Sequence, residues 1–536
     1  MRILALATLT LAVANMSSAA HIPHSNRRTA AASPDFDAKL DAFEAKYDAL
    51  LRKRGVPGMF FGLATTDSVI RTGGVGALDV ATPAAKVDGD SLFGIGSTAK
   101  AMTAALLSTL VAEGKIAALS DPIRKYYPHF ALKDPYTSTH CSFEDAMSHR
   151  TGMADFEILE HVDRYGDPDG IARRLKHLDP VHEFRTTFSY NNVMWDTIGH
   201  AAAHIINANA NTEDGSSSDS ATYETAMQDR LFKPIGMDRT TTLTDVALKN
   251  GNLATPHQRL APDAAKALNH DDVGVGGPSG SAYSSANDAI RFLQTLLRRG
   301  ESSTGSRVLE ENFVEDSIKP RMIIGSAVGG PKADSDTDFT ITTYGLGWFV
   351  ENYRGRRFVY HSGGVVGFST FFAWLPEHGV AAVAATNCEV DFTSETAVRD
   401  LLDIFFGEDN RGKDWPKIFD REPRFPKLPP PVPNTTPSHA DLSDYVGTYS
   451  HPAFGDARVS YDDARKSLVL DAVSKHVNCD LKHYHYDVFS CSYTYWPSII
   501  YDLMVSFQTD PRTGKINQFS IPLDLSAPDV IFTRTD

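Results

Sequence analysis

Cysteine is scarce in this chain, with four residues among 536, and the spacing of the four resembles no zinc site. Cys479 and Cys491 flank a predicted strand, turn and second strand, so in an oxidising compartment we expect a disulfide between them. Cys141 and Cys388 lie far apart in the sequence, which leaves open whether they meet. No metal and no cofactor is expected from these patterns.

Clustered positive charge is also lacking. The formal net charge is −15 at pH 7, and no run of lysine and arginine is longer than Arg52-Lys53-Arg54. Phosphate binding needs a basic face, so nucleic acid is excluded as a partner. Beyond the first 20 residues no apolar run reaches the roughly 18 residues that a membrane-spanning helix needs, so no membrane span is expected. The remaining composition is typical of a globular protein with more than one domain.

The first 20 residues have the pattern of a signal peptide. Arg2 supplies the positive charge, residues 3–13 form an apolar core, and Ser18-Ala19-Ala20 offers a small-residue cleavage site. The alternative, an apolar N-terminal anchor, is disfavoured because the segment is short for a bilayer. We therefore expect the protein to be secreted.

Early helices and strands are predicted from periodicity. Apolar residues at helical spacing predict a helix from residue 36 that ends at Gly55, and residues 58–64 and 68–72 read as a hairpin. Further helices are predicted at residues 101–118 and 144–149, the second capped by a glycine. Helix, strands and helix in this order are typical of an α/β or α+β domain.

A first chemical motif lies in residues 93–110, FGIGSTAKAMTAALLSTL. Ser97 stands where a glycine turn becomes a helix, and Lys100 follows one turn later on the same face. A desolvated lysine can take the proton of a serine hydroxyl and make it a nucleophile. Alone, Ser-x-x-Lys is also typical of a capping serine at a solvated helix start. The apolar helix that follows implies burial and favours the chemical interpretation.

A second motif is Phe188-Ser189-Tyr190-Asn191-Asn192, directly before a predicted helix. Tyr190 and Asn192 lie two residues apart on a short turn, where both side chains can enter one cavity. Tyr190 is suited to shuttling a proton, and Asn192 to holding a substrate amide or the lysine. A packing tyrosine and a helix-capping asparagine are the structural alternatives.

A third motif, residues 361–367, joins a histidine to glycines at the end of a predicted strand. Nothing projects from Gly363 and Gly364, so a substrate backbone can approach this strand. The N–H groups of Gly364 and Ser97 then make a candidate oxyanion hole. The structural alternative is that His361 ends a strand and the glycines form a bulge. The glycine- and serine-rich loop at residues 274–285 lacks the Gly-Lys-Ser/Thr ending of a phosphate-binding loop, and we expect it to pack closely at the edge of a pocket.

Taken in order, the three motifs resemble those of the serine penicillin-recognising superfamily: Ser97-Thr98-Ala99-Lys100, Tyr190-Asn191-Asn192 and His361-Ser362-Gly363. Histidine in the third motif resembles the class C β-lactamase-related hydrolases, which include D-alanyl-D-alanine carboxypeptidases, D-aminopeptidases and esterases. The resemblance covers residues 36–407 and extends to blocks such as SLFGIGSTAKAMTAALL and FSYNNVMWDTIGH. It implies an α+β fold, with an antiparallel sheet flanked by helices and an all-helical lobe.

The resemblance also implies roles for the motif residues. Ser97 would be the acylated nucleophile, Lys100 with Tyr190 the general base pair, and Asn192 the holder of the acyl amide. His361 would assist proton transfer and the electrostatics of the site.

Two further consequences concern the substrate. Gly363 and Gly364 would lie beside it, with the amides of Gly364 and Ser97 in the oxyanion hole. His361 stands where β-lactamases of this group usually carry lysine, and imidazole attracts a substrate carboxylate less strongly. Penicillin hydrolysis is therefore doubtful as the task, and no acidic residue is placed to act as a separate deacylation base.

The C-terminal part reads as a second domain. A proline-rich linker precedes it, with a glycosylation sequon at Asn434. Turn signals separate short strands and predict a small antiparallel barrel or sandwich that resembles lipocalin-like domains. His483 and His485 fall on one predicted strand face, as metal ligands or as a solvated face. The predicted strands are residues 445–449, 457–461, 467–472, 484–489, 504–509, 518–522 and 529–533.

The expected organisation is a signal peptide at 1–20, a catalytic domain at 36–407, a linker at 408–440 and a barrel at 441–536. The expected function is that of a secreted serine hydrolase that acts through an acyl-serine on a small amide, ester or D-amino-acid peptide. The alternative is an inactive binding or assembly scaffold, which would have no need of all three motifs. Peptidase, esterase, β-lactamase and acyltransferase are not separated, because loops such as 207–220 and 322–338 shape the pocket. The oligomeric state is left open.

Overall fold

The computed structural model describes most of the chain after residue 33. The predicted signal peptide and Asn434 lie outside the described residues, as do parts of the two pocket loops and of the linker. None of the described helices is long and apolar enough to cross a membrane. The described residues are 34–162, 167–210, 221–261, 264–270, 274–324, 341–389, 392–408, 414–418, 428–431, 433, 435–439, 441–474, 476–496 and 499–536.

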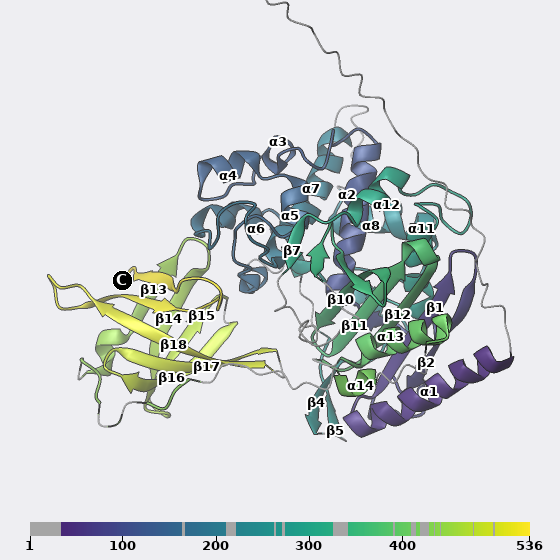
Figure 1. Ribbon diagram of the computed structural model, residues 1–536. Helices are drawn as coiled ribbons and strands as arrows, with labels where there is room; N and C mark the ends of the chain where they lie inside the picture. The colour runs from purple at the N-terminus through teal and green to yellow at the C-terminus, as the bar shows by residue number, and fades with distance from the viewer. Residues whose placement is uncertain are drawn as a thin grey trace, which may run out of the picture.

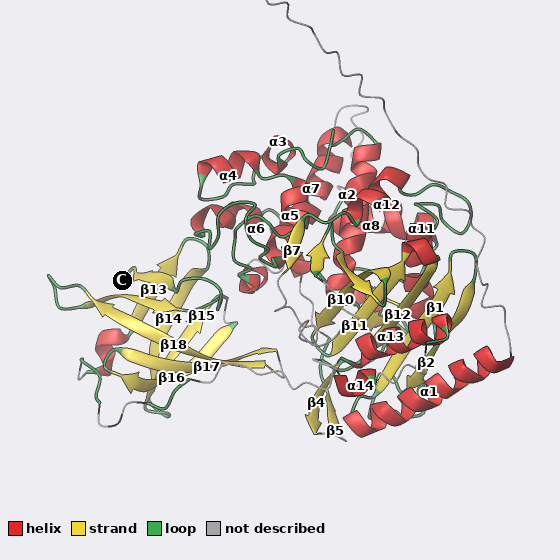
Figure 2. Cartoon of the chain, in the orientation of Figure 1, coloured by secondary structure: helices red, strands yellow, loops and turns green. Residues whose placement is uncertain are grey.

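The first domain is built on an eight-stranded antiparallel sheet in the order β2-β1-β12-β11-β10-β9-β8-β7 (Figure 2). Its central strands are buried on both faces, which explains apolar sequences such as FSTFFAWL in β11 and VAAVAAT in β12. The strands are β1 (Gly58–Thr65), β2 (Val69–Gly76), β7 (Met322–Ile324), β8 (Thr342–Tyr344), β9 (Phe349–Tyr353), β10 (Arg356–Val365), β11 (Phe368–Leu375) and β12 (Val380–Thr386). Two further two-stranded sheets pair β3 (Phe93–Gly94) with β6 (Tyr283–Ser284) and β4 (His257–Ala261) with β5 (Ala264–Ala267).

Helices cover both faces of this sheet. The helices α1 (Pro34–Arg54), α13 (Thr393–Phe406) and α14 (Trp415–Ile418) lie on one face, and α11 (Ala286–Leu297) lies on the other (Figure 1). The remaining helices, which include those of the helical lobe, are α2 (Ala99–Ala112), α3 (Ile123–Tyr126), α4 (Pro135–His140), α5 (Phe143–Met147), α6 (Gly170–Arg174), α7 (Asn192–Ala210), α8 (Tyr223–Met227), α9 (Lys233–Ile235), α10 (Thr244–Leu248) and α12 (Glu311–Ser317).

The predicted α+β class is confirmed, and two local predictions are wrong. Helix α2 ends at Ala112 rather than near residue 118, because Gly114 adopts a left-handed φ of 72° and ends the helical path. Helix α5 is not capped by a glycine. Its C-cap is Ser148, and the left-handed residue that follows is His149, with φ 57°.

The second domain is a closed barrel of eight strands, which confirms the predicted small β domain. The prediction of a strand at 484–489 is wrong, because Tyr486 takes a left-handed φ of 47° and turns the chain there. The aromatic composition of this segment conceals the turn. The strands are β13 (Gly447–His451), β14 (Gly455–Asp462), β15 (Ser467–Ala472), β16 (Val477–His485), β17 (Val488–Trp496), β18 (Ile499–Thr509), β19 (Ile516–Ile521) and β20 (Val530–Arg534).

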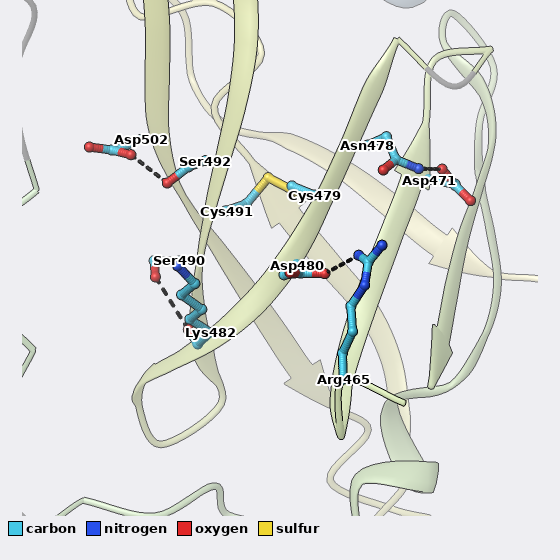
Figure 3. The surroundings of a disulfide bond; sticks show 10 residues. All are labelled: Arg465, Asp471, Asn478, Cys479, Asp480, Lys482, Ser490, Cys491, Ser492 and Asp502. Atoms are coloured by element: carbon cyan, nitrogen blue, oxygen red, sulfur yellow. Dashed lines mark hydrogen bonds and ion pairs between the residues drawn. A yellow bond between two sulfur atoms is a disulfide. The ribbon is translucent and has the colours of Figure 1, made fainter. Parts of the chain in front are cut away.

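The predicted disulfide is confirmed. Cys479 on β16 and Cys491 on β17 are bonded across the two neighbouring strands (Figure 3). Cys141 and Cys388 do not meet, and both are buried as thiols in the first domain.

Candidate active site

The turn that carries Ser97 lies directly against strand β10. Gly96 has a left-handed φ of 52°, and a Cβ there would come within 2.6 Å of the Gly364 nitrogen. A Cβ on Gly363 would come within 2.1 Å of the Ile95 carbonyl oxygen. Only glycines permit this approach, which brings the backbones of Ser97 and Gly364 to one cavity. The predicted oxyanion pair therefore has both members at the same place.

Lys100 is fully buried on the first turn of α2, and its amine contacts three oxygens. Its Nζ lies 3.0 Å from Ser97 Oγ, 2.6 Å from Asn192 Oδ1 and 2.7 Å from the Ser279 carbonyl oxygen. The amide and the carbonyl can only accept, so they hold two N–H groups of the amine. The third position of the amine points to the Ser97 hydroxyl, so the two groups are in direct hydrogen-bond contact.

Tyr190 lies beside this amine, with the centroid of its ring 4.8 Å from Lys100 Nζ. The ring of His149 stacks on Tyr190 at 4.3 Å and 25°, and so supports its position. His149 is itself fixed by the backbone N–H of Asn191, which donates to Nδ1 at 2.9 Å. Burial and the charge of Lys100 lower the pKa of His149, so its imidazole stays neutral. The sequence offered no sign of this histidine beyond its place at a helix end.

Asn192 begins α7 and is held by a carboxylate that no motif contains. Asp155 accepts hydrogen bonds from the Asn192 backbone N–H and, at 3.1 Å, from Nδ2. These contacts orient the Asn192 amide so that its Oδ1 faces Lys100. Burial and nearby Glu157 raise the pKa of Asp155.

His361 faces the site from β10, and both of its ring nitrogens are engaged. Nδ1 donates to the Ser362 carbonyl at 2.6 Å, so Nε2 accepts from the Tyr344 hydroxyl at 2.9 Å. Burial and the charge of Lys100 lower the pKa of His361 to about 3. The imidazole is therefore neutral, and it supplies no positive charge for a substrate carboxylate. Tyr344, which orients it, was not among the predicted site residues.

Two more buried carboxyls, those of Asp196 and Glu160, lie near the site. Asp196 on α7 accepts from the Ser279 backbone N–H at 2.8 Å and thereby fixes the loop whose carbonyl binds Lys100. Burial raises the pKa of Asp196 to about 7. Burial and the neighbouring Asp196 also raise the pKa of Glu160. These side chains retain protons at pH values where exposed carboxyls have lost them.

The cavity at Ser97 has a volume of about 60 Å³ and lies between the two domains. The predicted glycine- and serine-rich loop forms one wall of it, and Glu157 and Glu160 form part of another. Acidic groups that no motif contains thus reach the cavity. The described residues lining it are Ser97, Glu157, Glu160, His161, Asn192, Gly276, Ser279, Gly280, Ser281, Gly364, Val365, Val366 and His476.

His476 in this lining belongs to the barrel, which packs against the helical lobe (Figure 1). Its ring stacks on His161 with centroids 3.6 Å apart. Next to this pair, the Phe156 N–H donates to Asp524 Oδ2 at 2.9 Å. The second domain therefore borders the cavity, which the sequence did not indicate.

A second set of contacts joins the domains beside the stacked histidines. Arg174 at the end of α6 donates to the Ala453 carbonyl at 2.8 Å, and the Ser474 hydroxyl donates to the Val162 carbonyl at 3.2 Å. The rings of Phe156 and Phe454 add an edge-to-face contact at 5.5 Å.

The structure brings most of the predicted site residues together. The amine of Lys100 is surrounded by Ser97, Tyr190 and Asn192. His361 lies on the adjoining strand β10. Gly364 lines the cavity, whereas Gly363 packs against Ile95 and is not among the described lining residues. His483 and His485 flank a bulge in β16, and His483 Nε2 bonds the Tyr486 carbonyl at 3.0 Å.

Comparisons with known proteins agree with this geometry. The family described as Beta-lactamase matches residues 40–403, and a domain of unknown function, DUF3471, matches residues 430–534. An unguisins hydrolase of Aspergillus campestris is 26% identical over 426 residues, which cover 74% of each chain. Penicillin-binding protein 4 of Amycolatopsis lactamdurans is 26% identical over 413 residues, covering 76% of this chain and 96% of that protein. The octameric penicillin-binding protein homologue from Pyrococcus abyssi shares the fold, with a TM-score of 0.58 at 17% identity, covering 92% of this chain and 100% of that chain.

Proposed function

The chain belongs to the beta-lactamase family of hydrolases, and from that premise we propose that it hydrolyses small amides, esters or D-amino-acid peptides through an acyl-serine on Ser97. The observation that carries this proposal is the contact between Lys100 Nζ and Ser97 Oγ at 3.0 Å. The amine is buried and is held by neutral oxygens, which is the environment of a lysine that acts as a base.

In the acylation step, Ser97 Oγ bonds to the carbonyl carbon of the substrate while its proton passes to Lys100 Nζ. The bond from that carbon to the leaving nitrogen or oxygen breaks as Tyr190 relays the proton to the leaving group. The amides of Ser97 and Gly364 stabilise the oxyanion, and Asn192 holds the acyl amide. A water molecule then attacks the acyl-serine, its proton returns to Ser97, and the acid is released.

The charges of the cavity support a substrate other than a penicillin. No lysine or arginine is among its described lining residues, and the acidic Glu157 is. The neutral His361 adds no cation on the adjoining strand. A substrate carboxylate therefore gains little by binding here. The small cavity favours a compact acyl group, since sites for drug-sized ligands usually have volumes of about 300–1,000 Å³.

We also propose that the protein acts outside the cell. The support comes from the signal pattern of residues 1–20 and from the disulfide of the barrel, a bond typical of oxidising compartments.

The names of two relatives fit the proposed chemistry: one is a hydrolase of unguisins and the other a penicillin-binding protein.

A substrate panel tests the proposal. Chromogenic esters, D- and L-amino-acid anilides and a chromogenic cephalosporin are offered to the full chain, to Ser97→Ala and to Ser362→Ala. We expect an ester or a D-amino-acid anilide to be cleaved, the cephalosporin to be cleaved poorly, and only Ser97→Ala to be inactive. Ser362 is the matched control because its exposed hydroxyl lies on β10 next to His361. Equal turnover by Ser97→Ala would contradict the proposal, and no turnover of any compound would favour the scaffold.

A further inference from the structure

A cluster of metal-ligating side chains lies in the helical lobe, apart from the cavity. His129 follows α3, Asp169 precedes α6, and His204 belongs to α7. One ligand atom from each of the three lies within 4.8 Å of the others. Three segments distant in the sequence thus present two imidazoles and a carboxylate to one point.

The carboxylate of this cluster is already oriented. The hydroxyl of Tyr127 donates to Asp169 Oδ1 at 2.5 Å, and Asp169 Oδ2 lies 3.5 Å from His129 Nε2. Tyr127 is fully buried, so its hydroxyl is held against the Asp169 carboxylate. Hydrogen bonds of this kind hold the ligands of metal sites in place.

The rings around the carboxylate are also arranged in a fixed way. The rings of His129 and His204 are nearly perpendicular at 5.6 Å, and Tyr127 meets His204 edge to face at 5.2 Å. The side chains of His129 and Asp169 are 42% and 30% exposed, so an ion and its water can enter from solvent.

From this arrangement we propose that His129, Asp169 and His204 bind a divalent transition-metal ion of the zinc type. Two imidazole nitrogens and one carboxylate oxygen are common zinc donors, with bonds of about 2.0–2.2 Å, and water completes the tetrahedron. The exposed His129 imidazole has the freedom to close the remaining distance. Arg173 lies 3.7 Å from Asp169 Oδ2 and also pairs with Asp167. When the metal ion binds Asp169 in place of Arg173, the arginine keeps its ion pair with Asp167.

An ion here would act on the lobe as a structural clamp. Helix α7, which contributes His204, begins with Asn192 in the candidate active site. Helix α6, which follows Asp169, ends at Arg174, which contacts the barrel. The ion therefore joins the segment that holds the second domain to the helix that carries a site residue. The ligands come from three separate stretches, so no sequence spacing reveals them.

Calorimetric titration of the chelator-stripped full chain with zinc chloride tests the site. We expect one site in the unsubstituted protein, and affinity at least about 100-fold weaker in His129→Ala and in His204→Ala. His140→Ala is the matched control, because His140 is exposed on the same lobe and outside the cluster. Tyr127→Phe keeps all three ligands and should weaken binding by about 10- to 100-fold.

Thermal unfolding with and without zinc supplies a second readout. Zinc should raise the Tm of the unsubstituted protein and of His140→Ala, and leave the two ligand variants unchanged. The zinc-free Tm of each variant shows whether it has folded. Equal zinc affinity in the unsubstituted protein and the double variant His129→Ala/His204→Ala would overturn the proposal. Absence of binding at millimolar zinc to the folded, unsubstituted chain would overturn it as well.

Discussion

Two buried cations lie on opposite faces of the same sheet and are bound in opposite ways. On the face covered by α13, Arg399 contacts Glu395 at 2.8 Å and Glu351 at 3.3 Å. On the other face, Lys100 contacts three neutral oxygens, and no ion pair joins it to a carboxylate in the described part of the chain. Strand β10 separates them, with Tyr360 toward Glu351 and His361 toward the candidate site.

The surroundings of the two cations suit different roles, a structural one for Arg399 and a chemical one for Lys100. Although burial acts to lower it, Glu395 and Glu351 raise the pKa of Arg399, and its guanidinium lies over Phe358 at 4.9 Å. That cation is permanently charged and stabilises the packing of α13. Lys100 instead makes hydrogen bonds to Asn192, Ser279 and Ser97, and in the proposed function it exchanges a proton with Ser97. Four predictions probe this contrast, in order of decreasing expected effect.

The largest effect is expected from Lys100→Met, which removes the base while leaving an apolar chain in the same space. We expect kcat/KM to fall about 10³- to 10⁴-fold, toward the upper limit of general-base contributions. Steady-state kinetics on the best substrate of the panel measures this, with the far-ultraviolet spectrum as a check of folding. A loss below tenfold would show that Lys100 is not the base.

Arg399→Met should have the reciprocal effect, on stability rather than on activity. It leaves the buried Glu351 and the partly buried Glu395 without their cation, at a cost of about 3–5 kcal/mol in the free energy of unfolding. Denaturant unfolding measures the loss. The matched control is Arg357→Met, a half-exposed arginine on β10 paired with Glu377, for which about 1 kcal/mol or less is expected. If kcat/KM of the folded Arg399→Met protein fell as far as in Lys100→Met, the separation of roles would be wrong.

The raised pKa values of Asp196 and Glu160 predict that the free energy of unfolding depends on pH. The folded pKa of Asp196 is about 7 against an ordinary value of 3.8, so between these values the folded state binds more protons than the unfolded state. The free energy of unfolding contributed by this group therefore falls as pH rises through that window, by up to about 1.4 kcal/mol per pH unit. His361 acts in the opposite direction between pH 6.5 and about 3.

The informative quantity is thus the difference in unfolding free energy between the unsubstituted chain and Glu160→Gln/Asp196→Asn. In the double variant, the unfolding free energy should no longer fall as the pH rises. The control variant Asp502→Asn, on the barrel, should still show this fall. Parallel curves for all three proteins between pH 4 and 7.5 would refute a protonated carboxyl pair.

The smallest effects concern two tyrosines on the two faces. Tyr344→Phe removes the donor to His361 and should lower kcat about tenfold or less, with a changed pH profile. Tyr360→Phe removes a 3.3 Å bond to Glu351 and should cost about 0.5–1.5 kcal/mol of stability with kinetics unchanged. Each variant serves as the control of the other. Identical kinetic and stability changes in both would remove the distinction between the two faces.

Much of the candidate site could be predicted because each motif is short and contains its own chemistry. Ser97 and Lys100 lie one helical turn apart, and the glycines of β10 indicate a close backbone approach. The supporting contacts were missed because they join distant segments. Asp155 contacts Asn192 from a distant segment. Asp196 holds the loop of Ser279, which binds Lys100 through a backbone carbonyl, and a backbone group cannot be recognised from the residue type.

The barrel shows the same limit. Its strands alternate in burial, so the closed β domain and the disulfide follow from local pattern. The turn at Tyr486 was missed because aromatic and β-branched neighbours suggest a continuous strand. The approach of His476 to the cavity was also missed, since the docking of one domain on another depends on contacts such as the stacking on His161.

Covalent labelling tests whether Lys100 activates Ser97 as a nucleophile. The folded chain, Ser97→Ala and Lys100→Met are each exposed to a fluorophosphonate probe and then measured as intact protein by mass spectrometry. We expect one adduct on the unsubstituted chain, none on Ser97→Ala, and labelling slowed by about 10²-fold or more on Lys100→Met. Labelling of Ser97→Ala at the unsubstituted rate, or no labelling of the unsubstituted folded chain, would contradict this activation of Ser97.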